Sequence, residues 1–382
     1  QFLKKTCNNE FVFVAPYLRK YFINNSLNIN TIRSVCVFLG QIMDSITQIV
    51  LGAACGEAVL GKKIGNKALF FGAIGGTIPD LDVFVGDWLY DSEIQSMAYH
   101  RGFMHSIFFA ILGCLILGFL QHWIYNRGKR IGKIRRQEWI QLFFWSLLTH
   151  SLLDCFTAYG TQLFAPFSNY RVAFDNISVA DPLYTLPFLI CLIVMMFFNR
   201  SSKTRSILLK LAFGISSCYM LFTLANKAYV HNVFKSSLQD QGIEYLRFRT
   251  QPTILNNILW YGVAESESCY HAALYSILDG SKAPKKWQKI PKNHELLPTE
   301  DQDIKTLIWF SNGFYSISET DEKEAYIFKD LRYPLMDEED SNSSVFSFLI
   351  KKENNNWMLQ PIYMDQPNEK NFEDFWNRLK GI

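Results

Sequence analysis

One uncharged stretch limits what this chain can fold into. Residues Ser106–Leu120 read SIFFAILGCLILGFL and continue through QHWIY without a charged residue. A helix needs about 20 such residues to cross the hydrocarbon part of a bilayer. A second stretch, Leu183–Phe198 (LYTLPFLICLIVMMFF), is shorter and contains Pro187. Because soluble helical cores rarely need uncharged runs of this length, the sequence predicts an integral membrane protein.

Weaker segments extend the prediction to about six membrane segments. Glu138–Ala158 and Ile207–Val230 are apolar with a few polar residues. Ile46–Leu60 and Ala68–Val85 are rich in Gly and Ala and are interrupted by Glu57 and by the PDLD stretch. Small residues suit close helix packing in lipid, so we expect these two to be half-length or re-entrant. The predicted fold class is a mostly α polytopic membrane helical bundle followed by a small α+β extracytoplasmic domain.

The charges of the short loops predict an orientation. Asn126–Arg136 (NRGKRIGKIRR) carries six Lys or Arg and no acidic residue, while Asn199–Arg205 and Gly61–Lys67 carry three each. Basic loops stay in the cytoplasm. We therefore expect the alternate connections, and everything after about Val230, to face outward. In a bacterial inner membrane that side is the periplasm.

The first 42 residues fit this topology poorly. They start without methionine and lack the compact apolar core of a signal peptide. They would also place five basic residues on the outer side, namely Lys4, Lys5, Arg19, Lys20 and Arg33. We expect residues 1–42 to be an atypical extension and the natural protein to start at Met43, which N-terminal sequencing of the native protein would test.

Composition argues against two other classes of function. The net charge is only +3, and no basic stripe interleaved with aromatic residues is present, so we expect no nucleic-acid partner. The eight cysteines are scattered, with no C-x-x-C pair to hold zinc or to run redox chemistry. Chemistry in this chain must come from other side chains.

Acidic and imidazole side chains gather at one predicted edge of the membrane. Asp80 and Asp82 follow Pro79, whose ring breaks the second segment. His150 and Asp154, four residues apart, share one face of the fourth segment. Taken singly, a Pro-Asp pair is usually a turn, and a His-x-x-x-Asp spacing often means a local hydrogen bond. Their coincidence at one edge favours a function, because ionisable groups in or near lipid are costly.

Three further residues belong to the same predicted edge. His100 and His105 precede the third segment, and Asp44 begins the first. Imidazole and carboxylate are ligands of zinc, manganese and iron. The sequence therefore predicts a divalent metal site, with zinc favoured and manganese as the alternative. The remaining histidines are not near other candidate ligands in the sequence, and we assign them no role. They are His122, His231, His271 and His294.

Four stretches carry a family resemblance: MDSITQIVLGAACGEA, GAIGGTIPDLDVFVG, HRGFMHS and THSLLDCFTAYGTQLFAPFS. They resemble the successive motifs of the YdjM-like family of bacterial inner-membrane-associated metal-dependent hydrolases. That family is distantly related to the zinc-dependent phospholipase C and P1 nuclease group. The resemblance covers about Met43 to Pro182, and more loosely the remaining segments. It implies an integral inner-membrane protein with a polymetal hydrolase-like site.

The family's motifs fall on defined positions of this chain. They assign six metal ligands: Asp80, Asp82, His100, His105, His150 and Asp154. Asp44 and Gln48 are supporting candidates. Met104 stands where the family commonly has threonine, and Gln48 stands where many members have histidine. The second departure removes an expected ligand.

The expected function is hydrolysis of a phosphoester, in a phospholipid or another envelope-derived molecule, by metal-activated water. We expect Asp82 to act as general base and Arg101 to bind a phosphate oxygen as a fixed fork. For Arg101, contact with lipid headgroups is an equal alternative. The expected partners are membrane lipids and a small-molecule or lipid substrate.

Two other functions remain open. A non-catalytic regulator or scaffold could use the metal only to hold its helices together, and the resemblance implies a cytoplasmic regulatory partner for it. A transporter is less favoured, because such proteins usually show internal repeats and interrupted helices at the midplane. This chain shows no internal repeat.

From about His231 the composition becomes polar and aromatic with short apolar runs. TLIWFSNGFYSIS is predicted to form a hairpin about Asn312-Gly313, VFSFLIKK to pair with WMLQPIY, and NFEDFWNRLKGI to form a helix. The predicted domains are 1–42, 43–230 (membrane-embedded and hydrolase-like) and 231–382 (extracytoplasmic α+β). We expect the last to be a structural appendage, with a cap over the metal site or a binding module for an envelope ligand as alternatives.

Overall fold

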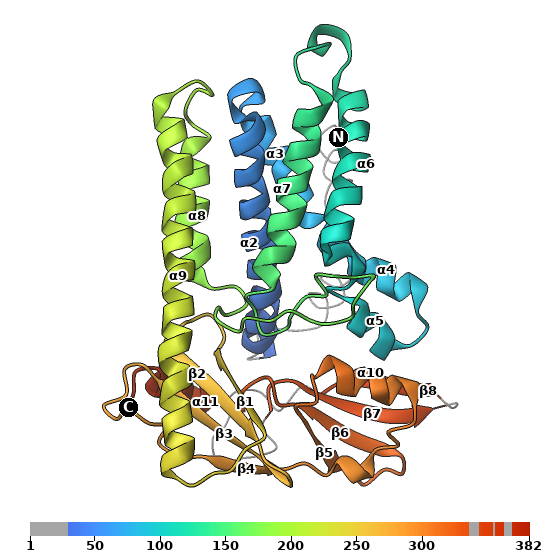
Figure 1. The fold of residues 1–382 in the computed structure, drawn as a ribbon, viewed down its shortest axis with the longest axis vertical. Coiled ribbons are helices and arrows are strands. Elements are labelled where there is room, and N and C mark those ends of the chain that lie inside the picture. The colour runs from blue at the N-terminus through green and yellow to red at the C-terminus, as the bar shows by residue number, and fades with distance from the viewer. Residues whose placement is uncertain (1–29, 336–343, 354–355, 363–368) are drawn as a thin grey trace, which may run out of the picture. The chain divides into compact units, whose positions relative to one another are not determined.

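The computed structural model describes residues 30–335, 344–353, 356–362 and 369–382, and side chains from residue 45 onward apart from 353, 356, 361 and 369–372. The predicted extension, residues 1–42, lies mostly outside the described part. The first half of the chain is helical (Figure 1). Its elements are α2 (Asn30–Ile64), α3 (Asn66–Thr77), η1 (Pro79–Leu81), α4 (Asp82–Leu89), α5 (Glu93–Tyr99), η2 (Phe103–His105), α6 (Ile107–Tyr125), η3 (Gly128–Arg130), α7 (Arg136–Asp154), α8 (Pro182–Met195) and α9 (Lys203–Asp240).

Glycines allow α2 and α3 to pack backbone against backbone. Gly52 and Gly56 of α2 face Gly72 and Gly76 of α3. A Cβ atom built on Gly52 would lie 2.5 Å from the carbonyl oxygen of Gly72, closer than real Cβ contacts come. This small-residue spacing is the one that lets helices approach closely in lipid.

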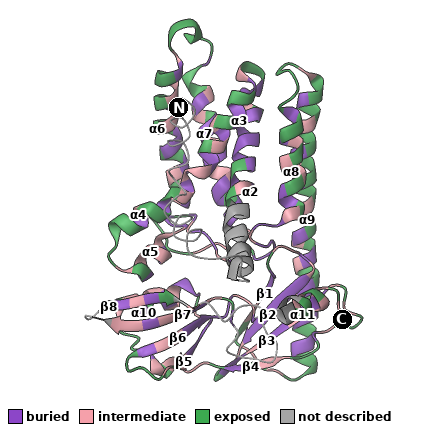
Figure 2. Ribbon diagram, turned by 180° about the vertical axis from the view of Figure 1, so that it is seen from behind, coloured by how far each residue is buried: buried purple, intermediate pink, exposed green. Residues whose placement is uncertain are grey.

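Apolar side chains hold the other helices in pairs. Trp139 and Leu142 of α7 are fully buried in a cluster with Ala110 of α6. Phe188 of α8 and Ala212 of α9 are buried in a second cluster, which also includes Val50 and Ala54 of α2. The helices α8 and α9 lie side by side in Figures 1 and 2.

The prediction of about six membrane segments is wrong. Among the described residues, two helices are long and apolar enough to cross a membrane: α6, with 19 residues, and α9, with 38 residues. An 18-residue window has a mean hydropathy of 2.1 in α6 and 1.8 in α9. The bent pair formed by α3 and Pro79–Leu89, with 41° between its halves, brings the number to three at most. The protein is therefore not a six-span bundle.

Length and polarity explain this difference. The helix α8 has 14 residues and spans only about 21 Å, whereas the hydrocarbon core is about 30 Å thick. The helix α7 is long enough, but it begins with Arg136 and Glu138 and ends with His150 and Asp154. The helix α7 buries Leu142 and α8 buries Phe188 against other helices, while Ile190 of α8 stays exposed. A hydropathy pattern does not show where such a helix ends.

The C-terminal half contains two antiparallel four-stranded sheets, each with its strands in chain order. The first consists of β1 (Arg247–Pro252), β2 (Leu259–Glu265), β3 (Cys269–Ser276) and β4 (Gln288–Pro291). The second consists of β5 (Tyr315–Glu319), β6 (Ala325–Asp330), β7 (Ser347–Glu353) and β8 (Asn356–Pro361). The helices α10 (Gln302–Phe310) and α11 (Glu369–Leu379) accompany them, with the 3₁₀ turn η4 (His294–Leu296).

The helix α9 joins the two halves of the chain. Its residues Val230 and Phe234 are fully buried against Trp260 and Tyr275 of the first sheet. The predicted domain boundary at residue 230 thus falls inside one continuous helix.

Local predictions for the C-terminal half had mixed success. The pairing of VFSFLIKK with WMLQPIY is confirmed, since β7 pairs with β8. The hairpin about Asn312-Gly313 is wrong. Both residues have positive φ, but they end α10, where the Gly313 N–H donates to Ile308 O and the Asn312 N–H to Trp309 O. Residues with positive φ occur both at the C-terminal end of a helix and in hairpin turns. An Asn-Gly pair in the sequence therefore does not distinguish the two.

The helix α5 is built into the second sheet's core. Ile94 is completely buried in one cluster with Leu307 of α10 and Ile317 of β5. The side chains of Ser92 and Gln95 donate to Asp303, at 3.0 and 2.9 Å. The segment that leads to His100 is therefore anchored by residues of the C-terminal half.

Replacing Gly72 with valine should lower the free energy of unfolding by at least about 1–3 kcal/mol, because its side chain would meet the α2 backbone. The control is Gly214→Val, since Gly214 on α9 has nothing within 4 Å of a built Cβ. Thermal unfolding in detergent measures both. Equal loss in the two variants would show that the close approach of α2 and α3 does not matter.

Ile94→Ala should cost about 2–5 kcal/mol, because a fully buried side chain is removed from a packed core. Ile111→Ala on α6 is the control, since Ile111 is half exposed. Limited proteolysis should release α5 first in the Ile94 variant. Unchanged protection would contradict the anchoring role of α5.

Candidate metal site

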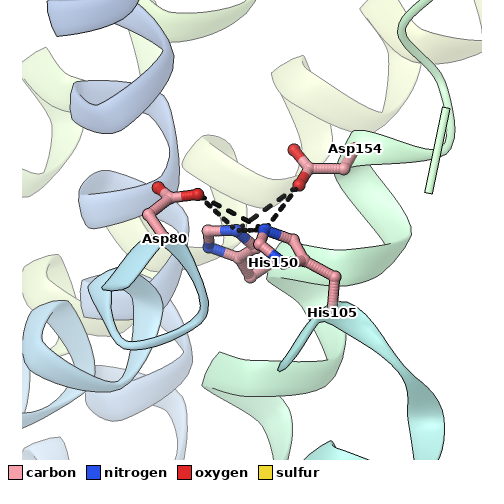
Figure 3. Close-up of side chains that lie close together, drawn as sticks. All are labelled: Asp80, His105, His150 and Asp154. Carbon is pink, nitrogen blue, oxygen red and sulfur yellow. Dashed lines mark hydrogen bonds and ion pairs between the residues drawn. The ribbon is translucent and has the colours of Figure 1, made fainter. Parts of the chain in front are cut away.

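Asp80, His105, His150 and Asp154 bring four ligand atoms within 4.8 Å of one another (Figure 3). The Nε2 atoms of the two histidines lie 3.1 Å apart. Each lies 3.3 Å from Asp80 Oδ1. Their distances to Asp154 Oδ2 are 3.3 Å for His105 and 3.4 Å for His150. Three separate elements, η1, η2 and α7, deliver these atoms.

These distances can be tested against the size of a metal ion. Zinc binds nitrogen and oxygen at about 2.0–2.1 Å, so neighbouring ligands of a tetrahedral ion lie about 3.3–3.4 Å apart. Neighbouring ligands of an octahedral ion with the same bond length lie only about 2.9 Å apart. Five of the six separations between the ligand atoms are 3.1–3.4 Å, near the tetrahedral value, and the sixth, between Asp80 and Asp154, lies within 4.8 Å. These residues therefore form a group that can hold a divalent metal ion.

In both imidazoles Nδ1 contacts an oxygen atom, which turns Nε2 toward the common point. His150 Nδ1 lies 2.6 Å from the carbonyl oxygen of Gly76, which can only accept, so Nδ1 carries the proton and Nε2 presents a lone pair. His105 Nδ1 lies 3.0 Å from Asp82 Oδ2. A ligating histidine whose other nitrogen is held by a carbonyl or a carboxylate is the usual arrangement around a protein-bound metal.

The electrostatic environment of His105 favours positive charge. Burial alone would lower the pKa of this imidazole, but hydrogen bonds to Asp80 and Asp82 outweigh that effect and raise it. The carboxylates thus draw a cation, whether proton or metal, to the point between them.

Asp82 lies beside the group of four ligand atoms and does not contribute one of them. Its carboxylate is fully buried and, besides His105, contacts His100 Nδ1 at 2.8 Å. It also accepts the backbone N–H of Arg101 at 2.9 Å. Asp82 is thus placed to orient both histidines. The side chain of His100 is 26% exposed and lies at the open side of the cluster.

Two backbone features bring these segments together. Pro79 follows the end of α3, so the chain turns through η1 at Asp80 before α4 starts. Arg101 has φ of 58°, a left-handed conformation that non-glycine residues rarely adopt. This turn returns the chain after α5, so that His100 and His105 have ring centroids 5.7 Å apart.

The guanidinium of Arg101 is buried inside the site. Its Nη1 donates to Thr157 Oγ1 at 2.7 Å, and its Nε lies 3.5 Å from Asp154 Oδ2. It also lies over the ring of Tyr159, 5.1 Å from the centroid. The side chain is only 5% exposed, so it lies beside the ligands and not among lipid headgroups. Asp44, a supporting candidate, lies outside the residues with described side chains.

Gln48, a supporting candidate from the sequence, reaches the site through a hydrogen bond. Its Nε2 donates to Asp154 Oδ1 at 2.6 Å, and its Oε1 is buried with no hydrogen-bond partner among the described residues. The substitution of glutamine for the family's histidine suggested a lost ligand, yet the side chain still reaches the site and orients Asp154.

The sequence missed Arg171. Its guanidinium donates to the carbonyl oxygens of Ala98 and His100, at 2.7 and 2.8 Å. Burial lowers the pKa of Arg171 to about 10, which leaves it charged at neutral pH. It lies over the rings of Tyr159 and Phe310 and so ties the His100 turn to α10. No motif names this residue, although it lies in the loop that follows Asp154.

Gln48→Leu should lower the affinity for zinc about 10–100-fold, because it removes the hydrogen bond that orients Asp154. Metal content after dialysis against buffered zinc measures the effect. The control is Gln121→Leu near the C-terminal end of α6. Equal affinities in the Gln48 variant and the wild type would show that Gln48 does not support the site.

Comparisons with known proteins show which family the chain resembles. The sequence model of the family described as "YdjM inner membrane protein" matches residues 43–230. Inner membrane protein YbcI of Escherichia coli (strain K12) is 32% identical over 139 residues, which are 34% of this chain and 75% of that protein. Uncharacterized protein YfhP of Bacillus subtilis (strain 168) is 30% identical over 150 residues, or 37% of this chain.

The match spans only 42% of the length of YfhP. No solved structure matches the chain significantly. The family match, the relative YbcI and two membrane-capable helices together place the protein in association with the inner membrane. The chain belongs to the YdjM inner membrane protein family.

Proposed function

We propose that the protein is a metal-dependent hydrolase that cleaves a phosphoester of a lipid or of another envelope-derived molecule. The observation that carries this proposal is the group of four ligand atoms, spaced for one ion and lined by a buried arginine. Buried charges this close together tend to mark functional sites.

The ion would be held by two nitrogens and two oxygens, from His105, His150, Asp80 and Asp154. A tetrahedral set of this kind favours zinc, with manganese as the alternative. When bound, such an ion polarises a phosphoryl oxygen and lowers the pKa of a bound water.

The chain's own residues suggest how a proton would be handled. Asp82 was expected to be the general base, but its oxygens are engaged by His105, His100 and the backbone of Arg101. His100 is better placed for this role. Asp82 holds its Nδ1, which leaves Nε2 of a partly exposed ring to accept a proton. Arg101 adds a fixed positive charge that would attract an anionic ester.

The site is proposed to face the periplasm in a protein that crosses the membrane more than once. The span α6 begins next to His105 and ends at the basic loop 126–136. Lys63 pairs with Glu138 at 2.7 Å, and Arg200 donates to Lys63 O at 2.6 Å, so the three basic loops share the opposite end. Basic loops are retained in the cytoplasm.

A structural role for the metal is the second candidate. The ligands come from three elements, so a bound ion would cross-link them and could serve a non-catalytic regulator or scaffold. A cytoplasmic regulatory protein would be the partner in that case. The two candidates differ in what metal removal does to the fold.

His100→Gln should reduce phosphoesterase activity at least about 100-fold while the fold and the bound metal stay intact. The assay uses zinc-loaded protein, bis(p-nitrophenyl) phosphate and a panel of phospholipid vesicles. Elemental analysis and thermal unfolding accompany it. The control is His231→Gln, since His231 stacks on Phe248, 4.3 Å between centroids, away from the site.

Two results would overturn the proposal. Absence of turnover on every substrate by the zinc-loaded wild type would refute a phosphoesterase. Two findings together would favour the structural role: the wild type unfolds when its metal is chelated, and the His150→Ala variant binds no metal and fails to fold.

A further inference from the structure

Large apolar side chains project outward from α4, the helix that begins with Asp82. Trp88 is 83% exposed and Phe84 65% exposed, and Val83 and Leu89 are exposed as well. A single exposed apolar residue is common on protein surfaces, but a contiguous group marks an interaction surface. Figure 2 shows α4 exposed along much of its length, near the N-terminal end of α6.

Part of α4 is buried, namely Asp82 in the site and Gly86 one turn later. Asp87 is exposed and accepts a hydrogen bond from Ser96 of α5 at 2.5 Å. The neighbouring helix α5 is anchored in the core of the C-terminal half through Ile94. The helix α4 is therefore held on one side, while no described residue covers its exposed apolar side chains.

A second group of exposed aromatic residues lies in the loop after α7. Phe167 is 82% exposed, and Phe164 and Tyr170 are exposed too. The ring of Phe167 meets that of Phe108 edge to face, with centroids 5.8 Å apart. Phe108 in turn lies 6.0 Å from Phe103, in the turn that ends at His105.

This second group continues the lipid-facing surface of α6. Phe108 is on the first turn of α6, whose outward side carries more exposed apolar residues, namely Ile111, Leu112, Leu115, Ile116 and Phe119. Since α6 is one of the membrane-capable helices, its outward side meets acyl chains. The apolar surface thus runs without interruption from a span to the turn that carries His105.

We infer that Phe84, Trp88, Phe167 and Tyr170 form an aromatic collar that is inserted into the headgroup–acyl boundary of the bilayer. Aromatic residues prefer this boundary. The occupant of the collar is lipid, because Phe167 contacts Phe108 on the exposed side of α6, the side that meets acyl chains.

The collar also indicates how a substrate enters, an extension that rests on the proposed function. Among the four ligands only Asp80 is accessible, with a side chain 31% exposed against 0–2% for the others. Asp80 lies between α3 and α4, at the bend of the pair that ends in the collar helix. A lipid ester would therefore reach the site sideways from the bilayer, with its acyl chains among the collar residues.

Depth-dependent fluorescence quenching tests the collar directly. The wild type, Trp88→Phe and the control Trp309→Phe are placed in nanodiscs of phosphatidylcholine brominated either near the glycerol or near the chain end. The fluorescence of Trp88 is the difference between the wild type and Trp88→Phe. Bromines near the glycerol should quench it strongly, bromines near the chain end should quench it less, and aqueous iodide should quench it little. The signal of Trp309, on α10, should respond to neither bromolipid.

Two outcomes overturn the inference. Quenching of Trp88 by iodide but not by bromolipid would place the helix in water. Absence of quenching by either would mean that a protein, such as a second copy of this chain, covers it. Both readouts are independent of any hydrolase activity.

A second arm tests the route of entry. Phe84→Ser with Trp88→Ser should slow hydrolysis of long-chain phospholipid in vesicles at least tenfold, and leave hydrolysis of a short-chain, water-soluble phospholipid and the zinc content unchanged. Equal slowing of both substrates would overturn lateral entry. No turnover of either substrate by the wild type would refute the proposed function, while the quenching result would still decide the collar.

Discussion

Buried carboxylates in close contact require positive charge between them, and this requirement governs the centre of the protein. Asp82 and Asp154 are almost completely buried, and Asp80 joins them at the surface of the cluster. Two imidazoles, one guanidinium and, on our proposal, a divalent ion neutralise the group. Without such compensation the desolvation of these acids would destabilise the fold by several kcal/mol. The break at Pro79, the left-handed Arg101 and the glycine contact of α2 with α3 all serve to hold this arrangement.

The C-terminal half contributes to the site through packing. It holds α5 by Ile94 and by hydrogen bonds to Asp303, and α5 leads directly to His100. Arg171 adds a second link, since it binds carbonyl oxygens next to His100 and lies over Phe310 of α10. Part of the order of the site therefore depends on residues far away in the sequence.

The motifs predicted which residue types would converge, because PDxD, H-x-x-x-D and the histidine pair are local patterns with recognisable chemistry. They did not predict the division of roles. Asp82 supports two histidines and lies outside the group of four, a fact that depends on side-chain directions in two separate turns. The roles of Gln48 and Arg171 also depend on distant partners, since Gln48 donates to Asp154 and Arg171 donates to the carbonyl oxygens of Ala98 and His100.

The sequence by itself determined that α6 is apolar enough to cross a membrane, that acids and imidazoles cluster near its start, and that β7 pairs with β8. These features depend on composition and short spacing. Only the structure decided that α8 is too short to be a span, that Asn312-Gly313 ends a helix, and which four side chains share one point. The same apolar residue can be buried against a helix or against lipid, and the same residue with positive φ can end a helix or form a hairpin turn. Contacts with distant parts of the chain decide between these structures.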